Sequence, residues 1–151
     1  MWGRFFNNMG LHLIVVFQLI YTCALRENVG VSELDNIAET SRIRNMTMGL
    51  TGILFCKDGS ILQILEGEES IVENLYEKIS KDTRISNALV LIRRQSDKRE
   101  FPNWSMGYRN ASKDPASFEL TIHSFRQSMP DEQSPELDTI GTTFARVNGL
   151  T

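Results

Sequence analysis

Residues 50–66, LTGILFCKDGSILQILE, decide the fold of this chain. Two apolar runs, 50–56 and 61–66, flank the tetrapeptide KDGS at 57–60. Asp-Gly between apolar runs is a strong signal for a tight β-hairpin, because both residues tolerate the positive φ that such turns need. We therefore expect two adjacent antiparallel strands here, and the flanking sequence predicts what covers them.

A helix is predicted on each side of the hairpin. Upstream, Ser32 and Asp35 match a capping box at a helix start, and Gly49 is typical of a helix end. Between them, residues recur at helical spacing: Leu34, Ile37, Ala38, Ser41 and Asn45. Downstream, acidic residues 68–69 favour the positive end of a second helix. Its predicted buried stripe is Ile71, Val72, Leu75, Tyr76 and Ile79.

The outer strands follow from three further runs. Residues 11–25, LHLIVVFQLIYTCAL, are apolar and rich in β-branched side chains, which predicts a buried central strand. The alternative is a targeting signal, but Gln18 interrupts the run, and it is shorter than the ~20 apolar residues of a membrane helix. Residues 87–93 predict a fourth strand, and 101–108 a short fifth strand.

The resulting order is β-α-β-β-α-β with an extra strand, which predicts an α+β, ferredoxin-like sandwich with a C-terminal helical segment. In this pattern we expect the first and third strands to form a central, parallel pair, with both helices on one sheet face. The predicted organisation is an N-terminal extension (1–12), one domain (13–110) and a C-terminal helical or flexible segment (111–151). Within that segment, Phe118, Leu120, Ile122 and Phe125 indicate a short helix, and 137–147 a weaker one.

Composition narrows the function classes. The chain has 151 residues and is 41% hydrophobic, which suits one compact domain. Its 16 basic and 19 acidic residues argue against nucleic-acid binding or a polybasic membrane surface. Two cysteines (Cys23 and Cys56) and two histidines argue against a disulfide scaffold and a zinc site. The cysteines fall on strands expected to be non-adjacent, so no disulfide is expected. Chemistry, if present, would come from a cofactor.

Three polar side chains are predicted to meet near the cleft between the helices. Strand alternation lets Tyr21 and Gln63 both point at the helices, and Asn45 ends the first helix on its core-facing side. One interpretation is purely structural, with Gln63 satisfying the Tyr21 hydroxyl and Asn45 serving as a helix-end residue. The other is that a hydroxyl and two carboxamides around an apolar groove bind a planar heterocycle with carbonyl and ring-nitrogen edges.

These residues lie in motifs that resemble the BLUF domains, blue-light sensors that use flavin, over about residues 13–110. The matching stretches, in order along the chain, are LIYTC (19–23), SRIRN (41–45), GLTGILF (49–55), LQILEG (62–67), KDTR (81–84) and FPNWSMGY (101–108). A single stretch would be weak evidence, but six in the right order and on the right elements are specific. One departure is Cys23, at a position where the family usually has serine.

The resemblance implies a flavin bound non-covalently between the two helices, with FAD expected and FMN or riboflavin as alternatives. It makes Tyr21 the photochemical donor and Gln63 the amide that bridges Tyr21 to the flavin, while Asn45 and Arg84 bond the ring edges. The implied flavin-contacting residues are Tyr21, Ile37, Ser41, Asn45, Leu54, Gln63, Ile79 and Arg84. Trp104 and Met106, which share one face of the predicted fifth strand by alternation, would carry the signal outward, together with 117–127.

The function predicted on this basis is a cytoplasmic blue-light photoreceptor of the short, stand-alone type, which turns over no substrate. Because no effector domain follows in the sequence, its output is expected to reach a partner protein or a second copy of the chain. Neither nucleic acid nor membrane is expected as a partner. Two alternatives remain open: a flavin-free ferredoxin-like interaction module, and a small acylphosphatase-like hydrolase.

Overall fold

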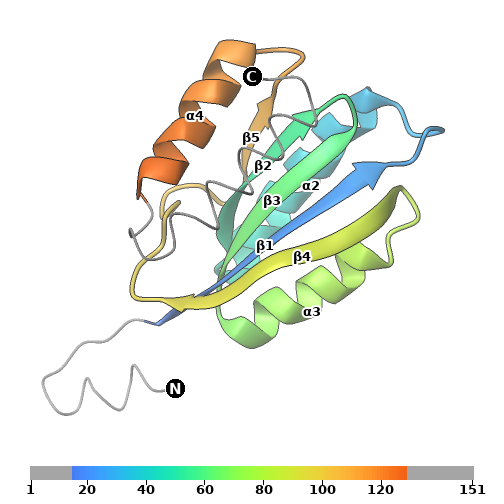
Figure 1. The fold of residues 1–151 in the computed structure, drawn as a ribbon. Coiled ribbons are helices and arrows are strands. Elements are labelled where there is room, and N and C mark those ends of the chain that lie inside the picture. Colours follow the sequence, from blue (N-terminus) through green and yellow to red (C-terminus); the bar gives the residue numbers. More distant parts are fainter. Residues whose placement is uncertain (1–14, 129–151) are drawn as a thin grey trace, which may run out of the picture.

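The computed structural model describes residues 15–128 (Figure 1). The elements in chain order are β1 (Val16–Leu25), α2 (Val31–Met48), β2 (Thr51–Lys57), β3 (Ser60–Gly67), α3 (Glu69–Ser80), β4 (Ile85–Ser96), β5 (Gly107–Asn110) and α4 (Pro115–Ser128). The predicted βαββαβ order with an extra strand and a following helix is confirmed. The extension 1–12 and the weaker helix predicted at 137–147 lie outside the described residues.

The strands of residues 15–128 form one sheet in the order β4-β1-β3-β2-β5. β1 and β3 are central neighbours, as predicted, but they run antiparallel. The expectation of a parallel central pair is therefore wrong. The crossover through α2 leaves β1 and β2 pointing the same way, and the hairpin then reverses the chain, so β3 must oppose both. At the sheet edge, β5 pairs with β2 in parallel.

The predicted hairpin is confirmed. β2 and β3 pair from Thr51 opposite Glu66 to Lys57 opposite Ser60. The turn residues Asp58 and Gly59 have φ values of 49° and 85°, the double positive φ that a tight two-residue hairpin turn requires.

Helix α2 ends as predicted but begins differently. Gly49 adopts the left-handed conformation, with φ of 66°, and its N–H donates to the Asn45 carbonyl. At the other end Gly30 is the N-cap, and no side chain caps the helix. The predicted capping box is wrong, because Ser32 already lies inside the helix. The Asp35 carboxylate instead forms an ion pair with Lys113 at 2.5 Å, a tertiary contact that the local pattern does not encode.

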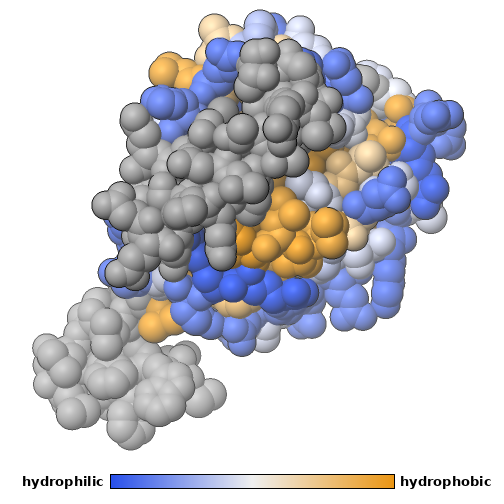
Figure 2. Space-filling view, viewed as in Figure 1, coloured by the Kyte–Doolittle hydropathy of each residue, from blue (hydrophilic) through white to orange (hydrophobic). Residues whose placement is uncertain are grey.

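The two sheet faces are covered by different helices (Figure 1). On one face, α3 packs over β1 and β3 while α2 packs over β2 and β5, so both helices cover the same face, as predicted. The core cluster on this face includes Leu19, Tyr21, Leu34, Leu65, Val72 and Leu75. On the other face α4 packs through Phe118, whose ring lies 5.3 Å from that of Phe55. Figure 2 shows that apolar side chains also reach the surface on this second face. The helix predicted around Phe118 is therefore confirmed, and its burial explains its position.

The fifth strand is shorter and later than predicted. β5 begins at Gly107, so Trp104 and Met106 both precede it. The prediction that they share one strand face is wrong: Met106 is 6% exposed, whereas Trp104 is 37% exposed. Pro102, which lacks a backbone N–H, lies in the irregular stretch that leads to Trp104 and cannot donate to a sheet ladder.

Both cysteines are buried and free. Cys23 on β1 and Cys56 on β2 each face Ile61 of β3 from opposite sides in the sheet register. The intervening strand separates them, which confirms the expectation that they lie on non-adjacent strands. Between residues 15 and 128, no helix combines the length and apolar character that crossing a membrane requires.

Candidate flavin site

A cavity of about 140 Å³ lies beside β1 and β3, under α2 and α3. Seven of the eight predicted flavin-contacting residues line it: Tyr21, Ile37, Ser41, Leu54, Gln63, Ile79 and Arg84. They come from both helices, from β1, β2 and β3, and from the turn before β4, so the tertiary fold brings together residues that are far apart in sequence. Its lining combines apolar side chains such as Ile37, Leu54 and Ile79 with polar and charged ones, and the Tyr21 and Gln63 side chains reach it from the sheet.

Tyr21 and Gln63 lie directly opposite each other on β1 and β3. Each is 2% exposed, and the Tyr21 hydroxyl donates a hydrogen bond to Gln63 Oε1. The Tyr21 ring meets Tyr76 of α3 edge-on, with centroids 5.1 Å apart. Burial, reinforced by the neighbouring Cys23 and Tyr76, raises the pKa of the Tyr21 phenol well above its usual value. Tyr21 therefore keeps its proton at neutral pH.

The other end of the Gln63 amide reaches the segment before β5. Gln63 Nε2 donates to the Met106 sulfur at 3.3 Å. A thioether is a weak acceptor, so this bond holds Met106 less firmly than a carbonyl would be held. Gln63 thus connects the Tyr21 hydroxyl with Met106 through the two ends of one side-chain amide.

Asn45 is fully buried but lies outside the residues that line the cavity. Its Nδ2 donates to the Ser105 carbonyl at 2.8 Å, and its Oδ1 accepts from the Arg44 guanidinium at 3.4 Å. Its backbone carbonyl accepts from Gly49, so the structural part of its predicted role, closing α2, is present. The placement of the Asn45 side chain ties the end of α2 to the segment that carries Met106.

Arg84 stands at the cavity between two carboxylates. Its guanidinium is 2.7 Å from Asp82 and 3.2 Å from Glu33, and both partners also line the cavity. The hydrogen bond from Arg84 lowers the pKa of the Asp82 carboxyl, and the same bond raises the pKa of Arg84. The cluster places charged donors and acceptors at one side of the cavity.

Sequence reasoning did not single out Arg44. This side chain lines the cavity and also an adjoining cavity of about 330 Å³ between α2 and α3, and Ile79 and Asp82 are shared in the same way. Burial lowers the pKa of its guanidinium. The signal in the sequence is weak, because one arginine among several in a helix looks like an ordinary surface charge.

The sequence model of the BLUF family, described as sensors of blue-light using FAD, matches residues 16–107. The chain belongs to the BLUF family. The match includes Tyr21, Asn45, Gln63, Arg84 and Met106. The predicted family is confirmed.

Solved BLUF proteins share the fold. The dark state of BlrB is 27% identical with a TM-score of 0.65, over 85% of this chain and 96% of that one. The ground state of BlsA is 29% identical with a TM-score of 0.62, over 78% and 82% respectively. Klebsiella pneumoniae BlrP1 with FMN and cyclic diGMP is 26% identical with a TM-score of 0.71, over 87% of this chain and 36% of BlrP1. The chain thus spans about a third of the longer BlrP1 relative. No curated protein matches it significantly.

These matches confirm the α+β, ferredoxin-like fold class and the predicted function: the chain is a flavin-based blue-light sensor. They give no support to the flavin-free module or to the acylphosphatase-like hydrolase. BLUF domains are sensors, although some relatives are longer chains.

The residues around the cavity fit a flavin. An isoalloxazine ring is flat, with apolar faces and a polar edge, and the cavity offers the apolar side chains Ile37, Leu54 and Ile79 with the Gln63 amide. Ligand pockets usually measure ~300–1,000 Å³, more than the inner cavity provides by itself. The adjoining cavity, which shares Arg44, Ile79 and Asp82 with the inner cavity, adds about 330 Å³.

Proposed function

We propose that this BLUF domain binds FAD non-covalently between α2 and α3, and that Tyr21 and Gln63 are its photochemical residues. The observation that carries the proposal is the continuous contact from the Tyr21 hydroxyl through Gln63 to Met106, next to the cavity. The description of the matched family names FAD, which favours it over FMN or riboflavin. The flavin-contacting roles of Ile37, Ser41, Leu54, Ile79, Arg84 and Asn45 stay predictions.

A bound flavin would supply the absorption of blue light and, in its excited state, an acceptor for an electron from a nearby phenol. Tyr21 provides a protonated phenol in a fixed position, and its hydroxyl proton points at Gln63 Oε1. Burial keeps bulk water away from this hydroxyl, so the proton it shares has Gln63 as its acceptor rather than solvent. Nothing in this scheme consumes a substrate, and we propose that the domain itself is not an enzyme.

Gln63 converts a change at Tyr21 into a change at Met106, in the buried part of the segment before β5. In the present arrangement its oxygen faces Tyr21 and its NH₂ group faces the Met106 sulfur. A half-turn of the amide exchanges the two, and the oxygen then faces a thioether, which has no proton to donate. The bond to Met106 is lost, so a local hydrogen-bond change alters how the segment before β5 is attached.

We propose that the output runs through Met106, Trp104 and residues 117–127 of α4 to a partner protein or a second copy of the chain. Trp104 lies near α4, because the Arg109 guanidinium sits 5.0 Å from its ring and donates to Thr121 of α4. A contact that begins at Gln63 therefore continues to the helix on the opposite sheet face. A cytoplasmic location and the absence of nucleic-acid or membrane partners stay predictions.

An absorption spectrum before and after blue illumination tests the proposal, followed by mass analysis of the released chromophore. We expect FAD and a reversible red shift of the blue band. A chromophore that is FMN or riboflavin would contradict the choice of FAD alone. A bound flavin without a light-induced shift would contradict the roles of Tyr21 and Gln63.

A further inference from the structure

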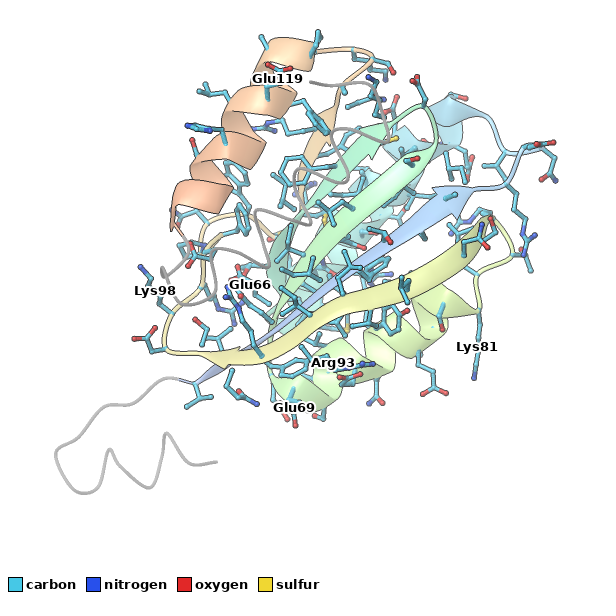
Figure 3. All side chains as sticks on the ribbon, in the orientation of Figure 1. Glu66, Glu69, Lys81, Arg93, Lys98 and Glu119 are labelled. Atoms are coloured by element: carbon cyan, nitrogen blue, oxygen red, sulfur yellow. The ribbon has the colours of Figure 1, made fainter. Side chains whose placement is uncertain are left out.

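Glu66 is a completely buried carboxylate near the end of β3, and nothing in the flavin site uses it. It lies three residues after Gln63, so strand alternation places it on the opposite face of the sheet. Figure 3 shows Glu66 at the end of β3, beside the chain that leaves β4. A buried charge is costly unless it is compensated by hydrogen bonds. The hydrogen-bond partners of Glu66 therefore show which segments this side chain fixes in place.

Donors from both neighbouring strands and from the chain beyond β4 converge on this carboxylate. Gln18 Nε2 donates at 2.6 Å and Thr51 Oγ1 at 3.2 Å, both from neighbouring strands. Two further donors are backbone groups: the N–H of Glu100 donates to Oε2 at 2.6 Å, and the N–H of Phe101 to Oε1 at 2.8 Å. Each oxygen of the Glu66 carboxylate thus accepts a hydrogen bond from one of two successive backbone amides, those of Glu100 and Phe101. Charge-assisted bonds of this kind are among the strongest in proteins.

Residues 100–106, the output segment, are therefore attached to β3 at both ends. The start is attached by Glu66, and the end by Met106, whose sulfur accepts from Gln63. Between these points the Trp104 and Ser105 carbonyls accept from the backbone of β2 and from Asn45. Among these attachments of the output segment, the bond to Met106 is the one that depends on which way the Gln63 amide points.

We propose that Glu66 is a positioning residue that fixes the start of the output segment, so that a change at Gln63 moves its end instead of shifting the whole segment. This inference rests on the proposed role of Gln63. A segment that is free at its start would follow Met106 as a unit and would transmit little to Trp104. Held at Glu100 and Phe101, it takes up the change between Phe101 and Met106. The Phe101 ring stacks on that of Trp104 with centroids 5.7 Å apart, and the bonds to the Trp104 and Ser105 carbonyls bear the displacement.

Glu66→Gln tests the proposal with almost no change in size. The glutamine side chain has an NH₂ group in place of one carboxylate oxygen. This NH₂ group then faces a backbone N–H, of Glu100 or Phe101, and that N–H loses its acceptor. Gln18 does not relieve this by turning over, because its own oxygen accepts from Arg94 at 2.6 Å. Glu100→Gln is the matched control: it makes the same chemical change within the output segment but leaves the backbone N–H of residue 100 in place.

Hydrogen exchange of the amides of residues 100 and 101 in the dark gives the first readout, with or without bound flavin. We expect at least about tenfold faster exchange in Glu66→Gln, the effect of losing one charge-assisted bond, and wild-type exchange in Glu100→Gln. The second readout is the light-minus-dark difference in exchange at residues 104–106. In Glu66→Gln we expect the same red shift of the flavin band as in the wild-type protein. The light-minus-dark difference in exchange at residues 104–106 should be at most half of the wild-type difference.

Glu66→Asp keeps the charge but shortens its reach, and we expect intermediate exchange; this variant carries the test if Glu66→Gln does not fold. Two results would overturn the role of Glu66 without affecting the proposed function. One is wild-type exchange at residues 100 and 101 in the dark in both Glu66 variants, and the other is a full light-minus-dark difference at residues 104–106 in these variants. A wild-type protein without any light-induced shift would overturn the proposed function and this role with it.

Discussion

Replacing Tyr21 with phenylalanine separates packing from hydrogen bonding in the flavin site. The change keeps the ring, which contacts Tyr76 edge-on at 5.1 Å, and removes only the hydroxyl that donates to Gln63. Gln63 Oε1 is then a buried acceptor without its donor, which costs about 1–3 kcal/mol. For a chain of this size, each kcal/mol lowers Tm by roughly 2–4 °C, so we expect a total loss of roughly 2–12 °C.

The functional consequence of Tyr21→Phe is larger than the structural one. Flavin should remain bound, because the cavity walls are unchanged, but the light-induced red shift should disappear with the phenolic proton. Calorimetry measures the first effect, and difference spectra after blue illumination measure the second. Tyr76→Phe is the matched control, since it removes a hydroxyl from the adjacent ring and leaves the Tyr21–Gln63 bond intact. A normal red shift in Tyr21→Phe, or its loss in Tyr76→Phe, would refute the reasoning.

Three further predictions concern the same face of the sheet. Gly52→Ala should lower the free energy of unfolding by about 1–3 kcal/mol in chemical denaturation, because the new methyl group would lie 1.9 Å from the Ile64 carbonyl oxygen. Asn45→Ala should weaken flavin retention about tenfold or more in equilibrium dialysis, because it frees the Ser105 carbonyl and loosens the neighbouring segment. Burial raises the pKa of Cys23 from 9.0 to about 12, so the folded protein holds this proton after the unfolded chain has lost it. Stability should therefore fall between about pH 9 and 12, by up to about 1.4 kcal/mol per pH unit, and an equally steep fall in Cys23→Ser would contradict this assignment.

Local patterns were sufficient for the elements that depend on neighbouring residues. The Asp-Gly turn, the end of α2 at Gly49 and the stripe of α3 follow from backbone preference and periodicity. Alternation and pairing together placed Tyr21 opposite Gln63. These features were predictable because turn chemistry and side-chain periodicity act over a few residues.

The same patterns failed where a distant group competes for a side chain. Asp35 was predicted to cap its own helix, but Lys113, which comes after the whole sheet, takes its carboxylate. Met106 was predicted to share a strand face with Trp104, but the chain is irregular there and Gln63 holds the sulfur inward. β3 runs antiparallel to β1, and not parallel as predicted, because the hairpin reverses the chain after β2.

The sequence by itself determined the hairpin, the order of the elements and the polar residues of the flavin site. Each of these depends on turn residues and side-chain periodicity within a few neighbouring positions. The tertiary structure decided which polar atoms meet: Asn45 with Ser105, Gln63 with Met106, and Glu66 with two backbone amides from beyond β4. Such contacts depend on the distance between segments after the core has formed. The cost of leaving a buried donor or acceptor unpaired then fixes the partners, and that cost has no counterpart in the local sequence pattern.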